Sequence, residues 1–133
     1  MWVIPRVILN KILGHAQRSA PAECVGILSG NDRDITGWHP LKNSLDQNNR
    51  FLADPEQQIE LFKTLRQQNR DVVAIYHSHP TSPPVPSELD IAQSEYPNAL
   101  YLIVSLDTEG CIEINGYRIN NGKAVEESLT IKE

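Results

Sequence analysis

The chain has 133 residues, of which 40% are hydrophobic and 22% are charged. These proportions are typical of a soluble globular domain, and a chain of this length can bury a core without disulfide or metal staples. Its seven glycines and nine prolines match background usage, which excludes collagen-like and broadly disordered chains. We therefore expect a single domain over residues 1–133.

Twelve basic and seventeen acidic residues give a net charge of −5, and the basic residues are scattered singly along the chain. This pattern argues against a nucleic-acid partner, because phosphate backbones are bound by clustered Lys and Arg. No apolar run approaches the roughly 18 residues of a membrane-spanning helix. The N-terminal residues also lack the basic stretch followed by an apolar one that is typical of a secretory signal peptide. We expect a soluble, cytoplasmic protein in which Cys24 and Cys111 are reduced, buried and inert thiols.

The first part of the chain predicts one helix followed by two strands. Apolar side chains recur at helical spacing over residues 4–17, with Pro5 suited to the first turn. A short apolar run bounded by glycine, residues 23–30, is typical of a buried strand and has Glu23 at its entrance. Residues 35–41 are expected to be extended. The positions that carry the helical pattern are Val7, Ile8, Ile12, Leu13 and Ala16.

The middle of the chain predicts a helix, a strand and a stiff loop. Asp54 can cap a helix over residues 54–69, and Pro55 fits its first position. Residues 72–76 form a continuous apolar strand that leads into the sequence His-Ser-His-Pro. Because residues 80–86 contain four prolines, this segment cannot be a regular helix or a central strand, and we expect an extended loop.

The last part of the chain predicts a short helix and three strands. Ser87 is a good N-cap for a helix to about residue 94. Extended segments are expected at 100–106, 111–119 and 124–131, with a hairpin turn after the first of them. The order of elements indicates an α/β or α+β domain in which a mixed β-sheet packs against two main helices. This plan is comparable to that of the cytidine deaminases, but the Pro-Cys-x-x-Cys motif of those zinc enzymes is absent.

Two histidines and one aspartate have the spacing of a metal site. His77 and His79 are separated by one residue, so in an extended chain both imidazoles project from the same side and can converge on one ion, while Ser78 points to the other side. Asp90 can supply a third ligand. Two histidines and a carboxylate leave one position of a zinc ion open for water, whose pKa falls toward about 7 at such sites.

Each candidate residue also has a structural explanation. Ser87 is equally well explained as a helix cap, and Asp90 by the helix dipole. An acidic residue at a strand entrance, such as Glu23, is usually just solvated. The remaining histidines, His15 and His39, have no ligand partner at a telling distance and are expected to be structural or exposed.

A wider pattern carries a family resemblance. His77-Ser78-His79-Pro80 is followed after six residues by Ser87 and after two more by Asp90, and Glu23 lies upstream in Pro-Ala-Glu-Cys-Val-Gly-Ile-Leu-Ser-Gly. This arrangement resembles the JAMM motif of the MPN-type zinc metalloproteases. The resemblance covers nearly the whole chain, because the first helix, the Glu-bearing strand, residues 50–55 and the second helix fall where that family has them.

The resemblance implies a role for each residue. His77, His79 and Asp90 would bind one Zn²⁺ per chain, and Glu23 would act as general base toward the zinc-bound water before handing the proton to the leaving amine. Ser87 would donate a hydrogen bond to the tetrahedral oxyanion. Elementary chemistry agrees, because a carboxylate beside a Lewis-acidic metal can deprotonate water, and amide hydrolysis also needs a proton delivered to nitrogen.

At 133 residues, the chain resembles the minimal, stand-alone prokaryotic members of this family. The resemblance implies a metalloprotease or isopeptidase that cleaves the amide bond after the C-terminal Gly-Gly of a ubiquitin-like sulfur-carrier protein. We expect the polar stretch of residues 43–50 to form the rim of a slot for that tail, which could add as a strand to a sheet edge. Two alternatives stay open: a zinc amidohydrolase acting on small peptides such as cell-wall fragments, and a non-catalytic MPN scaffold, although intact ligands count against the scaffold.

Overall fold

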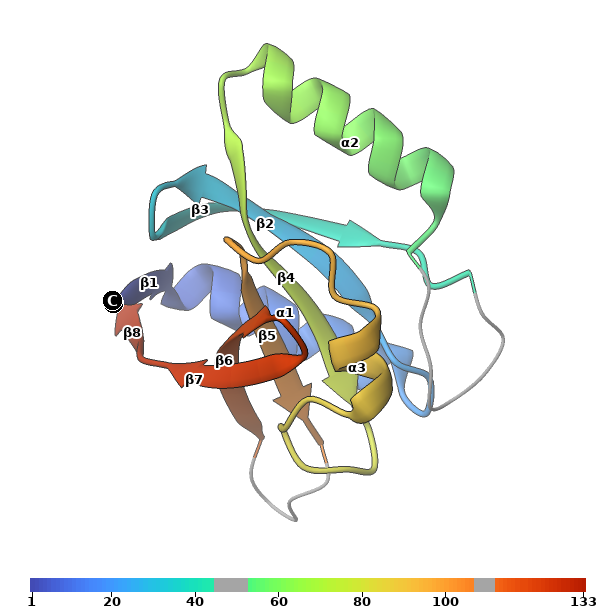
Figure 1. Cartoon of the computed structure of the whole chain (residues 1–133). Helices are drawn as coiled ribbons and strands as arrows, with labels where there is room; N and C mark the ends of the chain where they lie inside the picture. The colour runs from blue at the N-terminus through green and yellow to red at the C-terminus, as the bar shows by residue number, and fades with distance from the viewer. Residues whose placement is uncertain (45–52, 107–111) are drawn as a thin grey trace.

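The computed structural model describes residues 1–44, 53–106 and 112–133. Within these ranges, eight strands form one mixed sheet in the order β7-β6-β5-β4-β2-β3-β1-β8, accompanied by three helices (Figure 1). In chain order the elements are β1 (Trp2–Pro5), α1 (Arg6–Ser19), β2 (Val25–Asn31), β3 (Asp34–Leu41), α2 (Pro55–Gln67), β4 (Asp71–His79), α3 (Glu88–Ala92), β5 (Leu100–Ser105), β6 (Glu113–Asn120), β7 (Lys123–Glu127) and β8 (Leu129–Lys132). The expected mixed sheet with two main helices is confirmed.

Strand β4 lies at the centre of the sheet. It pairs antiparallel with β2 and parallel with β5, and the Cα partners of His77 are Val25 and Ile103. Successive side chains of a strand point to opposite faces, so the central strands bury both faces and read as continuous apolar runs. Tyr76 belongs to the apolar cluster around α1, whereas Ile75 belongs to the clusters on the other face.

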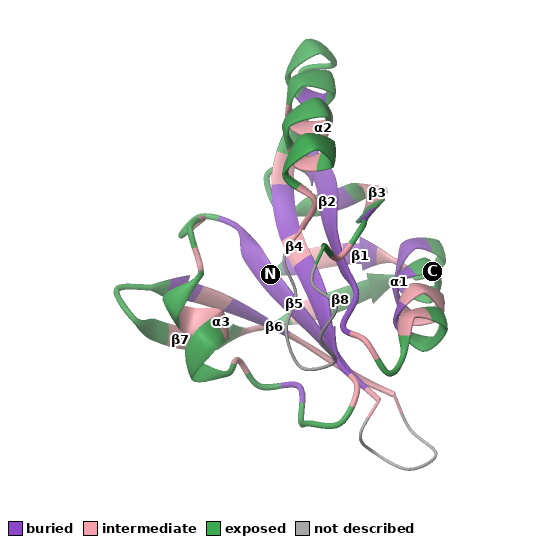
Figure 2. Cartoon of the chain, turned by 90° about the vertical axis from the view of Figure 1, so that its right-hand side faces the viewer, coloured by how far each residue is buried: buried purple, intermediate pink, exposed green. Residues whose placement is uncertain are grey.

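Helix α1 covers one face of the sheet, and α2 and α3 lie on the other (Figures 1 and 2). The buried side chains of α1 are Ile8, Leu9, Ile12 and Ala16. The helix begins later than the sequence predicts, because residues 2–5 pair with β8 as a strand and Pro5 is the N-cap residue. Val7 therefore lies outside the apolar stripe and is 65% exposed.

The last two strands correct a second expectation. The sequence predicts one strand over residues 124–131, but the strand is interrupted at Ser128, and β7 pairs with β6 while β8 pairs with β1. The two edges of the sheet are thus consecutive in the chain, and the sheet curls so that β7 runs into β8 beside the N-terminus (Figure 1). The predicted turn at 107–110 lies outside the described residues.

Candidate metal and active site

The two histidines of the predicted site lie at the end of the central strand. His77 and His79 are both buried residues of β4, and strand alternation places them on the face that carries Ile75, opposite helix α1. Ser78, between them, is fully buried on the α1 side. An inner strand of the sheet, paired on both sides, therefore presents both imidazoles in one direction.

Asp90 of the short helix α3 meets both histidines. Its Oδ2 lies 3.1 Å from His77 Nε2 and 3.0 Å from His79 Nε2, and the two Nε2 atoms are 3.1 Å apart. Ligands about 2.0–2.1 Å from a tetrahedral Zn²⁺ lie about 3.3 Å from one another. Two nitrogens and one carboxylate oxygen at this separation fit the zinc site that the spacing predicts.

The backbone of the proline-rich loop, residues 80–87, fixes the tautomer of His79. Its Nδ1 lies 2.8 Å from the carbonyl oxygen of Pro83, which can only accept, so in the neutral ring Nδ1 carries the proton and donates it. The lone pair is then on Nε2, the atom directed at Asp90. Metal-binding histidines are commonly oriented by such a bond from their other nitrogen.

Ser87 caps helix α3 and holds the Asp90 carboxylate. Its hydroxyl accepts a hydrogen bond from the Asp90 amide at 3.0 Å, and Asp90 Oδ2 accepts one from the Ser87 amide at 2.9 Å. Ser87 is thus the helix N-cap that the sequence predicts. The hydroxyl proton of Ser87 is not used in this capping bond, so capping and donation to a substrate are compatible.

Glu23 joins the histidines from the neighbouring strand. It directly precedes Cys24 and β2, and Ser78 holds this segment in two ways: the Ser78 hydroxyl accepts from the Cys24 amide at 2.8 Å, and the Ser78 amide donates to the Cys24 carbonyl at 3.2 Å. Ligand atoms of Glu23, His77 and His79 all lie within 4.8 Å of one another. Ser78, which points away from the histidines, therefore anchors the backbone of Cys24, the residue next to Glu23.

Burial and charge act on all four groups. Burial, together with the charge of Asp90, raises the pKa of Glu23 to about 7 against an opposing effect of His79. Burial lowers the pKa of His77 despite its bond to Asp90. The pKa of His79 is raised because its bonds to Asp90 and Pro83 outweigh burial, and that of Asp90 is lowered because its two histidine bonds likewise outweigh burial.

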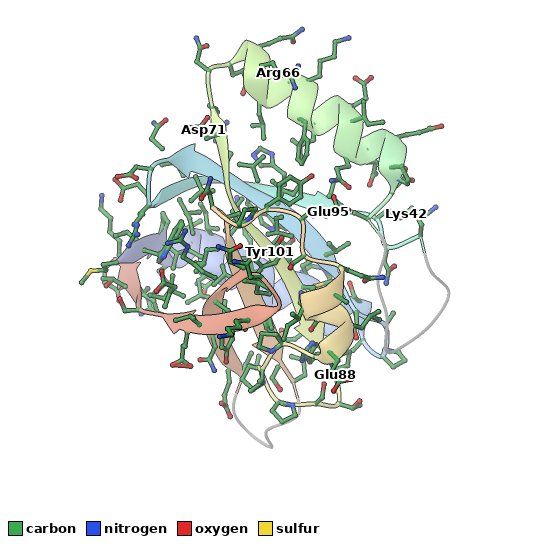
Figure 3. The ribbon with its side chains drawn as sticks, viewed as in Figure 1. Lys42, Arg66, Asp71, Glu88, Glu95 and Tyr101 are labelled. Atoms are coloured by element: carbon green, nitrogen blue, oxygen red, sulfur yellow. The ribbon has the colours of Figure 1, made fainter. Side chains whose placement is uncertain are left out.

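A cavity of about 420 Å³ opens beside the site, and His77 and Asp90 form part of its wall. The floor is apolar and comes from the sheet, while the rim includes residues 92–96, which start at the last residue of α3 and lead toward β5. The Tyr101 hydroxyl holds this rim by accepting hydrogen bonds from the amides of Glu95 and Tyr96 at 3.1 and 3.0 Å. Figure 3 shows Glu95 and Tyr101 between α2 and α3. Gln58 of α2 adds a 3.3 Å bond to Tyr96.

The other predictions from sequence can be placed as well. His15 bonds to the Tyr76 hydroxyl at 2.7 Å and His39 to the Ser29 hydroxyl at 2.8 Å, so both are structural. Cys24 is buried, and burial raises its pKa to about 11, as expected for an inert thiol. Cys111 and most of the expected rim, residues 45–52, lie outside the described residues. Among the described residues, no helix is long and apolar enough to cross a membrane.

The residues that hold the site in place carry no signal in the sequence. The rim contacts of Tyr101 and Tyr96, and the bonds from β5 and β6 to the proline-rich loop described below, join positions distant in the chain. No local pattern signals a side chain that donates to a backbone carbonyl on another element. Asn43 was singled out only as part of a rim, whereas its side chain donates to the Glu23 carbonyl at 2.9 Å.

Comparison with known proteins gives a consistent picture. A family model described as the prokaryotic homologs of the JAB domain matches residues 5–118. The desampylase of Haloferax volcanii is 36% identical over 105 residues, covering 74% of this chain and 76% of that protein. The CysO-cysteine peptidase of Mycobacterium tuberculosis is 29% identical over 133 residues, covering 98% and 91%.

Solved structures agree with the sequence matches. The solution structure of a protein from Desulfitobacterium hafniense has a TM-score of 0.90 at 28% identity and covers 100% of this chain and 94% of that one. A JAB1/MPN domain protein from Archaeoglobus fulgidus has a TM-score of 0.63 at 23% identity, with both chains covered completely, which shows the shared fold. Since the family model spans most of the chain and these neighbours share its fold, the chain belongs to the prokaryotic JAMM/MPN family, the homologues of the JAB domain.

Proposed function

We propose that this chain is a zinc-dependent isopeptidase that hydrolyses the amide bond after the C-terminal Gly-Gly of a ubiquitin-like sulfur-carrier protein. The observation that carries the proposal is the convergence of His77 Nε2, His79 Nε2 and Asp90 Oδ2 within 3.0–3.1 Å of one another. Glu23 lies beside the histidines, and the cavity opens next to them. Three ligands with one open position are the usual composition of a catalytic zinc site.

The names of the relatives support the reaction class. One is a desampylase, and another is a peptidase of CysO-cysteine, so both are named for cleaving a conjugate. Membership in the same family makes hydrolysis of a protein conjugate the simplest activity for this chain. The sulfur-carrier substrate and its Gly-Gly tail come from the family resemblance of the motif.

The residues of the site divide the work. His77, His79 and Asp90 would hold a Zn²⁺ ion, which would supply the Lewis acidity that polarises a carbonyl group and makes water more acidic. The Glu23 carboxylate takes a proton from the attacking water and delivers it to the nitrogen of the leaving amine, a task suited to a group whose pKa is about 7. The Ser87 hydroxyl donates to the oxyanion, with its position set by the Asp90 amide.

The cavity suits an extended protein tail. Its apolar floor can take the side chains that precede the glycines, whereas the glycines have no side chain to clash beside the buried histidines. A folded substrate domain would remain outside while its tail enters. This arrangement favours a protein conjugate over a small peptide.

The first test is the metal content of the purified protein by elemental analysis. We expect about one zinc per chain in the wild type and none in a His77→Ala, His79→Ala double variant. Glu23→Gln is the matched control, because it keeps all three ligands and should keep the zinc. Folded wild-type protein that takes up no zinc would contradict the proposal and favour the scaffold.

The second test is cleavage of a carrier protein joined through Gly-Gly to an amine reporter, followed by mass spectrometry. The wild type should release the carrier with a free Gly-Gly carboxylate, and Glu23→Gln should be slower by about 10²–10⁴-fold. A conjugate with Gly-Gly replaced by Val-Val should be resistant. Cleavage of short cell-wall peptides but not of carrier conjugates would favour the amidohydrolase instead.

A further inference from the structure

We propose that Tyr117 and Ser105 are positioning residues that clamp the proline-rich loop and thereby set the geometry of the metal site. The proposal rests on the proposed function of His77, His79 and Asp90 as a metal site. It concerns residues 80–87, which connect the end of β4 to helix α3. Neither Tyr117 nor Ser105 belongs to the JAMM pattern.

Three consecutive carbonyl groups of this loop are held by three different strands. The Ser82 carbonyl accepts from the Ser105 hydroxyl of β5 at 2.6 Å, and the Pro83 carbonyl accepts from His79 Nδ1 of β4 at 2.8 Å. The Pro84 carbonyl accepts from the Tyr117 hydroxyl of β6 at 2.8 Å. The sheet thus donates hydrogen bonds to three consecutive residues of the loop, and one of the three donors, His79, is an expected metal ligand.

The loop needs these bonds because it lacks regular structure of its own. Its prolines have no amide hydrogen and fixed φ angles, so a few anchors determine the path of the whole segment. Pro84 is buried, and only Val85 and Pro86 separate it from Ser87. A shift of the Pro84 carbonyl therefore reaches the cap of α3 and the Asp90 carboxylate directly.

The Tyr117 hydroxyl is oriented for this bond. Asn115 Nδ2 lies 3.5 Å from the hydroxyl and 3.4 Å from the Pro84 carbonyl, so the hydroxyl can accept from Asn115 while it donates to Pro84. The ring itself packs in the apolar cluster with Tyr101, Ile103 and Ile119. Tyr117→Phe keeps the ring and removes the donor, which makes it a specific probe of the clamp.

Tyr76→Phe is the matched control. Tyr76 is also a buried tyrosine of the sheet, and its hydroxyl accepts from Trp38 Nε1 at 3.0 Å and bonds to His15 at 2.7 Å. It belongs to the apolar cluster on the opposite face, around α1. A general loss of stability would affect both variants, whereas a loss of loop position would affect Tyr117→Phe alone.

The first measurement is the zinc dissociation constant by competition with a chromogenic chelator. Partners that orient metal ligands typically contribute about 10–100-fold to affinity, so we expect Tyr117→Phe and Ser105→Ala each to bind zinc roughly tenfold more weakly. Tyr76→Phe should stay within about twofold of wild type. Circular dichroism spectra and melting curves check that each variant is folded.

The second measurement needs no metal and uses amide hydrogen exchange of the metal-free protein. The amides of Ser87 and Asp90 form the capping bonds, so both should exchange about tenfold faster in Tyr117→Phe, while the amide of Ala74 in β4 should not. In Tyr76→Phe no such selective change is expected.

The proposal would be refuted if Tyr117→Phe bound zinc as tightly as the wild type and if its amides of Ser87 and Asp90 exchanged at the wild-type rate. If the wild type binds no zinc, the proposed function fails. The hydrogen-exchange assay, which needs no metal, then tests by itself whether Tyr117 positions the loop. If Tyr117→Phe does not fold, Ser105→Ala decides in both assays.

Discussion

Replacing Glu23 by glutamine is expected to stabilise the metal-free protein at alkaline pH, although it removes the proposed general base. Glu23 is only 7% exposed, and burial raises its pKa from 4.5 to about 7. A carboxyl group with a higher pKa in the folded protein lowers stability as it ionises, so the cost is absent below the unfolded pKa and complete above the folded one. Because one pKa unit corresponds to about 1.4 kcal/mol, the ionised carboxylate costs roughly 3 kcal/mol.

The assay is urea denaturation in EDTA at several pH values between about 4 and 8.5. The free energy of unfolding of Glu23→Gln should rise relative to wild type by roughly 3 kcal/mol across this range, mostly between the two pKa values. Glu60→Gln, at an exposed position of α2, is the control and should differ from wild type by no more than about 0.5 kcal/mol. A difference between Glu23→Gln and wild type that does not depend on pH would refute the reasoning, because it would mean that Glu23 is solvated in the folded protein.

Three further predictions follow from the same structure. Ser87→Ala should lower turnover by roughly tenfold to a thousandfold with zinc still bound, and normal kinetics would leave Ser87 a helix cap only. In a Cys111→Ser background, Cys24 should react with iodoacetamide at about pH 8 roughly a hundredfold more slowly than in urea, because burial raises its pKa to about 11; equal rates would contradict its burial. Burial and neighbouring arginines lower the pKa values of His15 and His39, so the unfolded chain binds more protons and stability should fall as the pH drops below about 6.5. Denaturation at several pH values checks this, and a His15→Gln variant with an unchanged slope would contradict a role for His15.

Much of the fold is predictable from the sequence because the central strands are buried on both faces. Residues 72–76 and 100–106 read as continuous apolar runs for this reason, and both are strands of the sheet. The failures involve the N-terminus and the C-terminus. Strand β1 pairs with β8, more than a hundred residues away, and four residues are too few to be recognised as a strand from their pattern alone. Residues 124–131 read as one extended segment, although they form parts of two strands at opposite edges of the sheet.

The convergence of the candidate site residues was predictable for a different reason. Strand alternation places His77 and His79 on the same side of β4, and Ser87 caps the short helix that carries Asp90, so local rules predict the element on which each potential ligand lies. Glu23 depends on the pairing of β2 with β4, which residues alone do not reveal. Only the family resemblance placed Glu23 beside the histidines before the structure did.

The site therefore has two halves with different mechanical support. His77 and His79 belong to the central strand, where hydrogen bonds to β2 and β5 fix the backbone on both sides. Asp90 lies on a helix of five residues, which the proline-rich loop connects to the end of β4. Neither this helix nor the loop is part of the hydrogen-bonded sheet. The position of Asp90 depends on side chains of the sheet that donate to the loop, Tyr117 among them. Small perturbations of these donors should consequently weaken metal binding before they destabilise the fold, whereas changes that break the backbone pairing of β4 with β2 and β5 should do both together.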